Sequence, residues 1–312
     1  MQREDVDWHG YWVAAPTPFT ASGELDETGW AQLVRLYAGQ GVHGLLVNGS
    51  TGEWFSQSPA ERRRVVEIAV EAAAGRLPVV VGVSAYTVAE AGALAEHAAE
   101  TGADGVLATP PPYVHPSADE IVAFYTSLGR SSDLPLMVYN WPRGVSVDLA
   151  ATPGLMRRLA GIDQVVAIKD STGDWLRMLN TVEAVADQVR VFGSFISRRG
   201  LAVLRGLGGD GNIDGGGLGA PFAVPFYDAV AADKVGEAEQ SALRYLAISG
   251  RLINPDYSGI FASPIAQLKA AMTMLGHPAG PPRPPLLPLT GPEKLAAIRA
   301  ILVDGGLLAG TG

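Results

Sequence analysis

Lysine is scarce in this chain, and one of its four lysines stands apart from the others. Lys169 lies at the end of the apolar segment VVAIKD, whereas Lys234, Lys269 and Lys294 lie in helical or linker contexts. An apolar environment disfavours the ammonium form and lowers the pKa of the amine. A neutral amine attacks carbonyl carbons, so the sequence predicts a Schiff-base lysine at position 169. The alternative is a buried lysine paired with the neighbouring Asp170.

A second group of polar residues, NGSTGE, directly follows another apolar segment. Its glycines, Gly49 and Gly52, flank the hydroxyl groups of Ser50 and Thr51. In such a turn, backbone amides and hydroxyls can converge on a carboxylate without a positively charged side chain. We therefore interpret Gly49, Ser50 and Thr51 as a candidate carboxylate-binding site. A glycine-containing turn with hydroxyl caps is the alternative.

Two tyrosines occupy positions where they could carry protons. Tyr139 ends the apolar segment LPLMVY, and Tyr113 follows the stiff sequence TPPP. A phenol can relay a proton at a site where histidine would be charged or too large. Packing at the end of a strand is the alternative for Tyr139. The proline-rich loop would project Tyr113 outward or toward another subunit.

The composition excludes several kinds of chemistry and partner. The chain has no cysteine, and its five histidines share no metal-ligand spacing, so we expect neither disulfides nor a metal site. The net charge of −9 provides no basic face for nucleic acid. No apolar run approaches the roughly 18 to 20 residues that cross a membrane, and the first residues lack the apolar stretch of a signal peptide. We therefore expect a cytoplasmic protein that binds neither nucleic acid nor membrane.

Seven short apolar segments and a last, glycine-rich candidate strand alternate with longer segments that have helical composition. Such fully apolar strands are typical of a parallel sheet that is buried on both faces. The segments are Tyr11–Pro16, Gly44–Val47, Pro78–Val83, Gly105–Ala108, Leu134–Tyr139, Val165–Ile168, Val189–Phe192 and the glycine-rich Asp210–Ile213. Capping boxes at Ser58, Thr87 and Ser117 indicate where three of the intervening helices begin.

This alternation predicts an α/β fold, a (β/α)₈ TIM barrel with an appended C-terminal helical segment. We assign residues 1–225 to the catalytic barrel and residues 226–312 to C-terminal helices packed on it. The alternative is an open doubly wound sheet, and GLGGDG at 206–211 formally matches its dinucleotide fingerprint. That string follows a helix-like stretch and leads into a strand, which is the wrong context for the motif.

Taken together, these motifs resemble those of the dihydrodipicolinate synthase and N-acetylneuraminate lyase family of class I aldolases. The resemblance is carried by four motifs in the family's order and spacing: GSTGE at 49–53, Tyr113, YNWP at 139–142 and KDSTGD at 169–174. It implies a (β/α)₈ barrel, no cofactor, and a homo-oligomer, either a tetramer or a dimer. The partners that it implies are pyruvate or another 2-oxo acid and an aldehyde.

The resemblance also implies roles for individual residues. Lys169 would form an imine with the keto carbon, and Tyr139 matches the tyrosine that transfers the proton. Ser50 matches the relay hydroxyl, and Thr51 with neighbouring amides would hold the carboxylate of the 2-oxo acid. Tyr113 matches a relay tyrosine lent to an adjacent subunit. Ile213 lies where the family places a backbone carbonyl near the bound keto acid.

The chain departs from the lysine-pathway synthases at the residue that binds the second substrate. Those enzymes carry an arginine two residues after the proline of this motif, where this chain has Gly144, and Arg143 is displaced by one position. We expect this displacement to turn the guanidinium away and to disfavour dihydrodipicolinate synthesis. The prediction is therefore a Schiff-base aldolase or lyase. The alternatives are a dehydratase of a deoxy sugar acid, dihydrodipicolinate synthase proper and a catalytically silent ligand-binding barrel.

Overall fold

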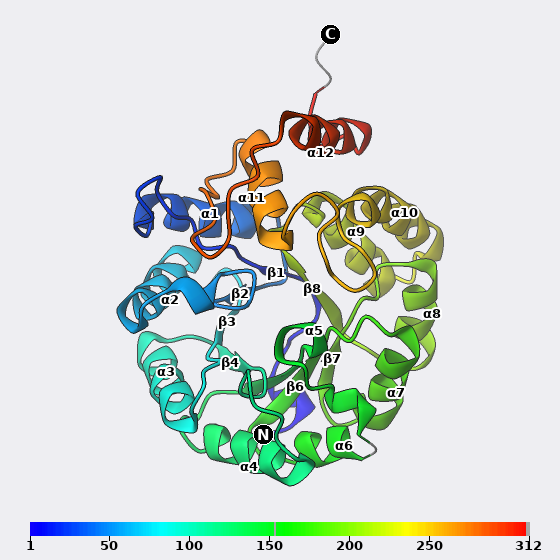
Figure 1. Ribbon diagram of the computed structural model, residues 1–312. Helices are drawn as coiled ribbons and strands as arrows, with labels where there is room; N and C mark the ends of the chain where they lie inside the picture. Colours follow the sequence, from blue (N-terminus) through cyan, green and yellow to red (C-terminus); the bar gives the residue numbers. More distant parts are fainter. Residues whose placement is uncertain (153, 310–312) are drawn as a thin grey trace.

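The computed structural model describes residues 1–152 and 154–309, which form a closed barrel of eight parallel strands (Figure 1). Each strand pairs with the next along the sequence, and β8 pairs with β1. The strands are β1 Gly10–Ala14, β2 Gly44–Val47, β3 Val79–Gly82, β4 Gly105–Ala108, β5 Leu136–Asn140, β6 Val165–Asp170, β7 Arg190–Phe192 and β8 Gly211–Gly215. The (β/α)₈ barrel expected from the sequence is confirmed, and the open doubly wound sheet is excluded.

A ring of helices surrounds the barrel (Figure 1). The ring consists of α1 Glu27–Gly39, α2 Pro59–Ala73, α3 Val88–Thr101, α4 Ala118–Gly129, α6 Leu155–Ala160, α7 Trp175–Val185, α8 Arg198–Gly206 and α9 Ala220–Ala231. Ser58 and Ser117 form complete capping boxes at the starts of α2 and α4. At α3 only half of the expected box forms, in which the Thr87 hydroxyl accepts from the Glu90 amide. Local capping therefore sets where these helices begin.

Apolar side chains fill two layers, one inside the barrel and one between the strands and the helices. Successive side chains of a strand point to opposite faces, so each strand supplies both layers. On β1, for example, Trp12 packs inside the barrel and Val13 packs outside it. Strand β8 is the exception, because its sequence GNIDG places polar side chains beside the barrel mouth. These polar groups become part of the cavity described below.

The C-terminal segment adds α10 Val235–Leu252, α11 Pro264–Met274 and α12 Pro292–Asp304. Residue 225, where we expected the barrel to end, falls inside α9, which packs against both β1 and α10. Figure 1 shows α12 outside the ring and α11 between α1 and α9, while the chain between α10 and α11 passes over the barrel near β8. This crossing brings residues of the C-terminal segment to the barrel mouth. Within 1–152 and 154–309, no helix has the length and apolarity to span a membrane.

Candidate active site

A cavity of about 820 Å³ opens where the strands end at their carboxyl termini. Its floor is formed by residues at or just after the ends of the strands, and α10 and the following loop cover one side. Five of the site residues predicted from the sequence line it: Ser50, Thr51, Tyr139, Lys169 and Ile213. The carboxyl end of a (β/α)₈ barrel is where catalytic residues gather.

Strand β6 carries Lys169 into the apolar interior of the barrel. Its side chain is 7% exposed, and Nζ lies 4.2 Å from the centre of the Tyr139 ring. Burial lowers the pKa of the Lys169 amine to about 7, although the negative charge of Asp214 acts in the opposite direction. A large fraction of this amine is therefore neutral and nucleophilic near neutral pH.

Asp170 does not pair with Lys169, and that interpretation of the sequence is wrong. The Asp170 carboxylate accepts hydrogen bonds from Asn140 Nδ2 at 2.9 Å and from Thr181 Oγ1 at 2.6 Å. Adjacent side chains on a strand point to opposite faces, so Asp170 faces the helices while Lys169 faces the cavity. The lysine is thus left available for chemistry.

Tyr139 lies level with Lys169 on the neighbouring strand β5. Burial raises the pKa of the Tyr139 phenol well above 10, and hydrogen bonding with Ser171 and Ser50 acts in the opposite direction. The phenol is therefore protonated at neutral pH and can give its proton to a neighbouring group. Its ring stacks on Trp141 at a distance of 5.9 Å between ring centres.

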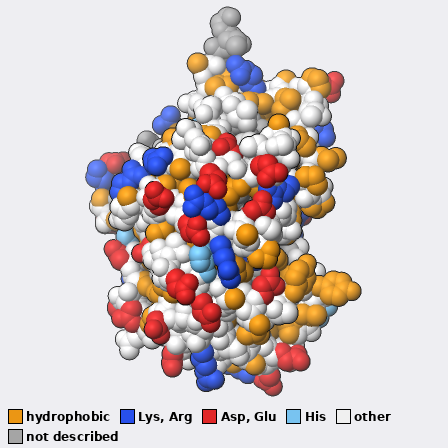
Figure 2. All heavy atoms as spheres, turned by 90° about the vertical axis from the view of Figure 1, so that its left-hand side faces the viewer, with side chains coloured by type: hydrophobic (Ala, Val, Ile, Leu, Met, Phe, Trp, Pro, Cys, Tyr) orange, Lys and Arg blue, Asp and Glu red, His pale blue; other side chains and the backbone are white. Residues whose placement is uncertain are grey.

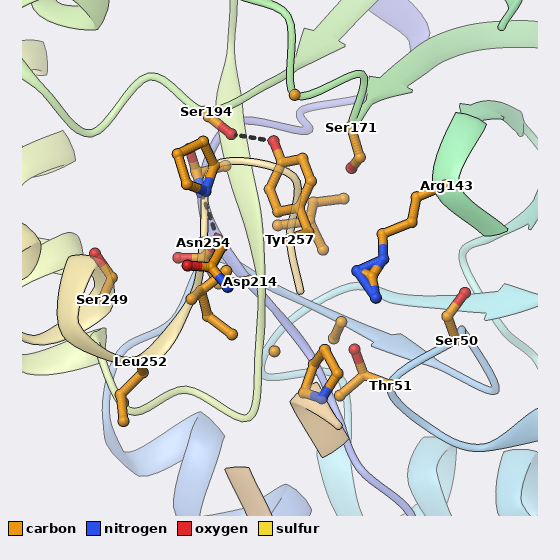
Figure 3. Close-up of a pocket in the computed structure, with 18 of the residues that line it drawn as sticks. Ser50, Thr51, Arg143, Ser171, Ser194, Asp214, Ser249, Leu252, Asn254 and Tyr257 are labelled. Carbon is orange, nitrogen blue, oxygen red and sulfur yellow. Dashed lines mark hydrogen bonds between the residues drawn. The ribbon is translucent and has the colours of Figure 1, made fainter. Parts of the chain in front are cut away.

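The NGSTGE turn after β2 presents Ser50 and Thr51 to the cavity, as Figure 3 shows. Gly49, the third predicted residue of this turn, is buried and is not part of the cavity lining, and a Cβ atom there would lie 3.3 Å from Leu46 Cδ2. Asn48 begins the turn with a left-handed backbone, φ 52°, and its side-chain amide donates to the Arg62 carbonyl at 2.7 Å. The contacts of Asn48 hold the first part of the turn in place, so the hydroxyl groups of Ser50 and Thr51 keep a defined direction.

Buried charges hold the far end of the same turn, and sequence reasoning missed them. Lys269 of α11 contacts Glu53 Oε1 at 2.5 Å and donates to the Thr17 carbonyl at 2.8 Å. The Arg283 amide donates to Glu53 Oε2 at 2.9 Å. Nothing local in the sequence indicates these contacts, because they join residues more than 200 positions apart. The C-terminal segment thereby anchors the turn that presents Ser50 and Thr51.

Tyr113 is the one predicted catalytic residue that the structure places away from the cavity. Its side chain is 91% exposed, and its backbone is left-handed, with φ 78°. Exposed apolar side chains also follow the two preceding strands, Phe55 after β2 and Tyr86 after β3, and Val114 is exposed beside Tyr113. Figure 2 shows hydrophobic side chains gathered along one edge of the molecule.

Arg143 reaches the cavity, and the expectation that its guanidinium turns away is wrong. Figure 3 shows the side chain pointing inward from the short helix α5, Pro142–Val145. A Cβ atom at Gly144 would lie 2.0 Å from Cδ1 and Nε1 of the Trp141 indole. The indole leaves no room for a side chain at position 144, and Arg143 brings its guanidinium to the cavity from the neighbouring position.

Three further cavity residues were missed from the sequence: Ser194, Asp214 and Tyr257. The hydroxyl groups of Ser194 and Tyr257 lie 2.6 Å apart, and the Tyr257 ring packs edge-on against Trp141 at 5.6 Å. Tyr257 has a left-handed backbone, φ 63°, in the loop after α10. The sequence of this loop, INPDYSGIFAS, resembles an ordinary connection between helices, so no sequence signal pointed to an active-site residue there.

The structure also bears on metal binding. Across 1–152 and 154–309, the side chains of histidine, aspartate and glutamate form no group of three or more that is arranged to hold a metal ion.

The fold and the cavity define the class of protein. A lysine of lowered pKa inside a (β/α)₈ barrel, next to a protonated tyrosine, is the site of a class I aldolase or lyase. The model of the Dihydrodipicolinate synthetase family matches residues 7–303, and the chain belongs to this family.

Curated relatives agree with the family model. A 4-hydroxy-tetrahydrodipicolinate synthase of Acidiphilium cryptum is 34% identical over 304 residues, which cover 97% of this chain and all of the relative. An uncharacterized DapA-like lyase of Rhizobium meliloti is 33% identical and covers 91% of each chain. Both matches run through the barrel and into the C-terminal segment.

Solved structures of the family superpose on nearly the whole chain. YagE, a prophage protein of Escherichia coli K12 in complex with pyruvate, has a TM-score of 0.86 and 26% identity, covering 97% of this chain and all of that one. Dihydrodipicolinate synthase from Acinetobacter baumannii, also complexed with pyruvate, has a TM-score of 0.83 and 27% identity, covering 96% and 99%. The chain is thus an enzyme of the lyase type.

Proposed function

We propose that this enzyme forms an imine between Lys169 and pyruvate or another 2-oxo acid, and then makes or breaks a carbon–carbon bond next to the imine. The observation that carries the proposal is the buried Lys169 amine, whose pKa is lowered to about 7 at the mouth of the barrel. Relatives of this chain in complex with pyruvate support the choice of 2-oxo acid.

The reaction would begin when the neutral Lys169 amine attacks the keto carbon. Tyr139 lies beside this amine and would give the proton with which the keto oxygen leaves as water. Thr51, Ser50 and the amides of their turn would hold the carboxylate. The resulting iminium withdraws electrons, and the Tyr139 phenolate left by the first step would take back a proton from the neighbouring carbon. This yields an enamine, which attacks an aldehyde. Ile213 would contribute its backbone carbonyl beside the bound keto acid.

Reductive trapping tests this proposal directly. Borohydride reduces an iminium to a stable secondary amine, so wild-type protein treated with pyruvate and borohydride should gain the mass of one reduced pyruvyl group per chain. Omitting pyruvate provides the control. A chain that gains no mass with any 2-oxo acid would instead indicate a silent ligand-binding barrel.

Tyr139→Phe should reduce turnover by about 10²- to 10⁴-fold, the usual contribution of a general acid–base group. The ring remains to pack on Trp141, so the melting temperature should change little. Steady-state kinetics with pyruvate and a reactive aldehyde would measure the loss. If Tyr139→Phe retains nearly full activity, the tyrosine has only a packing role.

Dihydrodipicolinate synthesis is the second candidate, and the position of Arg143 favours it. Aspartate semialdehyde carries a carboxylate that a guanidinium can hold, so it should be a better acceptor than an uncharged aldehyde of similar length. Arg143→Ala should lower kcat/KM for aspartate semialdehyde by about tenfold to two-hundredfold and leave the uncharged aldehyde unaffected. Equal kcat/KM values for the two aldehydes in wild type would remove this candidate.

A dehydratase of a deoxy sugar acid would use the same imine to expel water. Product analysis separates the two reactions, because an aldolase releases pyruvate and an aldehyde whereas a dehydratase releases a dehydrated oxo acid. Both reactions would proceed without a cofactor.

We further propose that the chain acts as a homo-oligomer in which Tyr113 serves the site of a neighbouring subunit. The support is its placement: the side chain is exposed, lies outside its own cavity, and is accompanied by the exposed Phe55, Tyr86 and Val114. Whether the assembly is a dimer or a tetramer follows from the mass of the protein in solution. One family member with a solved structure is a monomeric variant, so a monomer in which Tyr113 is idle is the contrary outcome.

A further inference from the structure

The outer part of the cavity contains a carboxylate that the proposed imine chemistry does not use. Asp214 follows Ile213 on β8, lines the cavity and is partly exposed to it. Its Oδ1 accepts a hydrogen bond from Asn212 Nδ2 at 2.7 Å, and its Oδ2 accepts one from the Tyr245 hydroxyl of α10. These two donors, from different elements, fix the direction of the carboxylate.

The fixed carboxylate retains capacity for a ligand. Its two oxygens together offer about four acceptor positions, and the protein fills two of them. Figure 3 shows Asp214 near Asn254 on one side of the cavity and Arg143 on the other side. The Tyr257 ring lies between these two walls, and its hydroxyl group points to Ser194. The outer cavity therefore offers an acceptor and a cation at opposite ends, with neutral polar groups between them.

The charges around Asp214 decide which donor fits it. Lys169 already lies near enough to interact electrostatically with Asp214. Among the described residues, the other titratable groups beside Asp214 are neutral phenols, those of Tyr11, Tyr227, Tyr245 and Tyr257. A ligand ammonium would bring a second positive charge close to the iminium that the proposed reaction forms at Lys169. A hydroxyl donates an equivalent hydrogen bond without adding charge.

We propose that Asp214 is a specificity-determining residue whose carboxylate accepts hydrogen bonds from hydroxyl groups of the second substrate, while Arg143 holds that substrate's carboxylate. The second substrate would then be a hydroxylated aldehyde acid. This inference rests on the proposed function, because the second substrate is the molecule that reacts with the enamine at Lys169.

Calorimetric titration of the full chain with three six-carbon acids tests the site without chemistry. Gluconate carries hydroxyl groups, hexanoate carries none, and 6-aminohexanoate carries an ammonium group. We expect wild type to bind gluconate more tightly than the other two. Asp214→Asn should weaken gluconate binding by about tenfold to a hundredfold, the loss expected for hydrogen bonds to a charged group, and leave hexanoate unchanged.

Asp228→Asn is the matched control, because Asp228 is an exposed carboxylate of α9 outside the cavity lining. Its affinity for gluconate should equal that of wild type. Should Asp214→Asn fail to fold, Tyr245→Phe removes one of the donors that fix the carboxylate and should weaken gluconate binding several-fold. Its binding of hexanoate should stay unchanged.

The inference is overturned if hexanoate or 6-aminohexanoate binds wild type as tightly as gluconate, or if Asp214→Asn binds gluconate as wild type does. Reductive trapping with pyruvate, run on the same wild-type sample, separates the two claims. If pyruvate is trapped but the affinity for gluconate does not depend on Asp214, only the proposed hydroxyl-binding role of Asp214 is refuted. If the affinity for gluconate depends on Asp214 but no pyruvate is trapped, only the proposed imine chemistry is refuted.

Discussion

Lys169→Met should produce a folded barrel whose pyruvate-dependent turnover has fallen by about 10⁴- to 10⁶-fold, the scale of losing a covalent nucleophile. Methionine has nearly the length of lysine and suits the apolar site, so the free energy of unfolding should not decrease. Lys169→Arg should be equally inactive, because a guanidinium stays protonated and cannot form the imine. Steady-state kinetics and a denaturant titration measure the two effects.

Peptide mapping after reductive trapping should place the pyruvyl group on Lys169 alone. Lys269 is the instructive comparison, because it is also buried and burial lowers its pKa. Its ammonium, however, is held by Glu53 at 2.5 Å and lies outside the cavity lining. Lys234 and Lys294 are exposed ammonium groups. An adduct on any of these three lysines would contradict the assignment.

The rate of trapping should depend on pH through the same amine. Burial lowers the Lys169 pKa to about 7, and only the neutral form attacks the keto carbon. The rate of imine formation should therefore rise with pH and level off above about 7. An amine with an ordinary pKa would continue to gain rate up to about pH 10.

The sequence predicts the barrel well because the relevant signals are local. Apolar strands such as Val165–Ile168 and caps such as Ser58 are formed by neighbouring residues, so their periodicity and spacing indicate the fold without tertiary information. Lys169 and the NGSTGE turn are recognisable for the same reason, since each follows directly from the end of a strand. The carboxyl ends of all strands meet at one mouth, which brings these distant motifs together.

Other parts of the site depend on contacts that no local pattern contains. Tyr257 lines the cavity because the loop after α10 passes over β8. Lys269 forms an ion pair with Glu53, which lies 216 positions earlier in the chain. The prediction for Arg143 failed for a related reason. In the four-residue helix α5, Arg143 faces the cavity, whereas a side chain at position 144 would meet the Trp141 indole, and no local pattern indicates this arrangement.

Lys269→Met should destabilise the protein by about 3 to 5 kcal/mol, the effect of leaving a buried charge without its partner. The Lys269 ammonium contacts Glu53 at 2.5 Å and donates to the carbonyls of Thr17 and Pro281, and both charged side chains are almost fully buried. Removing it leaves the Glu53 carboxylate with the Arg283 amide as its remaining donor. Denaturant unfolding of the variant and wild type measures the difference.

Lys294→Met is the matched control, because the same substitution at an exposed lysine should change the free energy of unfolding by no more than about 0.5 kcal/mol. Combining Lys269→Met with Glu53→Gln should recover part of the loss, since an amide leaves no unpaired charge behind. If the double variant is as unstable as the sum of the single variants, the two side chains do not act as a pair.

The same variant should reveal what the buried pair contributes to binding. Glu53 ends the turn that presents Ser50 and Thr51, and its left-handed backbone, φ 58°, is kept in place by the contacts of its side chain. Because a loosened turn holds the pyruvate carboxylate less well, Lys269→Met should raise the KM for pyruvate while Lys169 is still trapped at saturating pyruvate. An unchanged KM in a destabilised variant would show that the pair supports the fold alone, and that the turn keeps its geometry through Asn48 and Arg62.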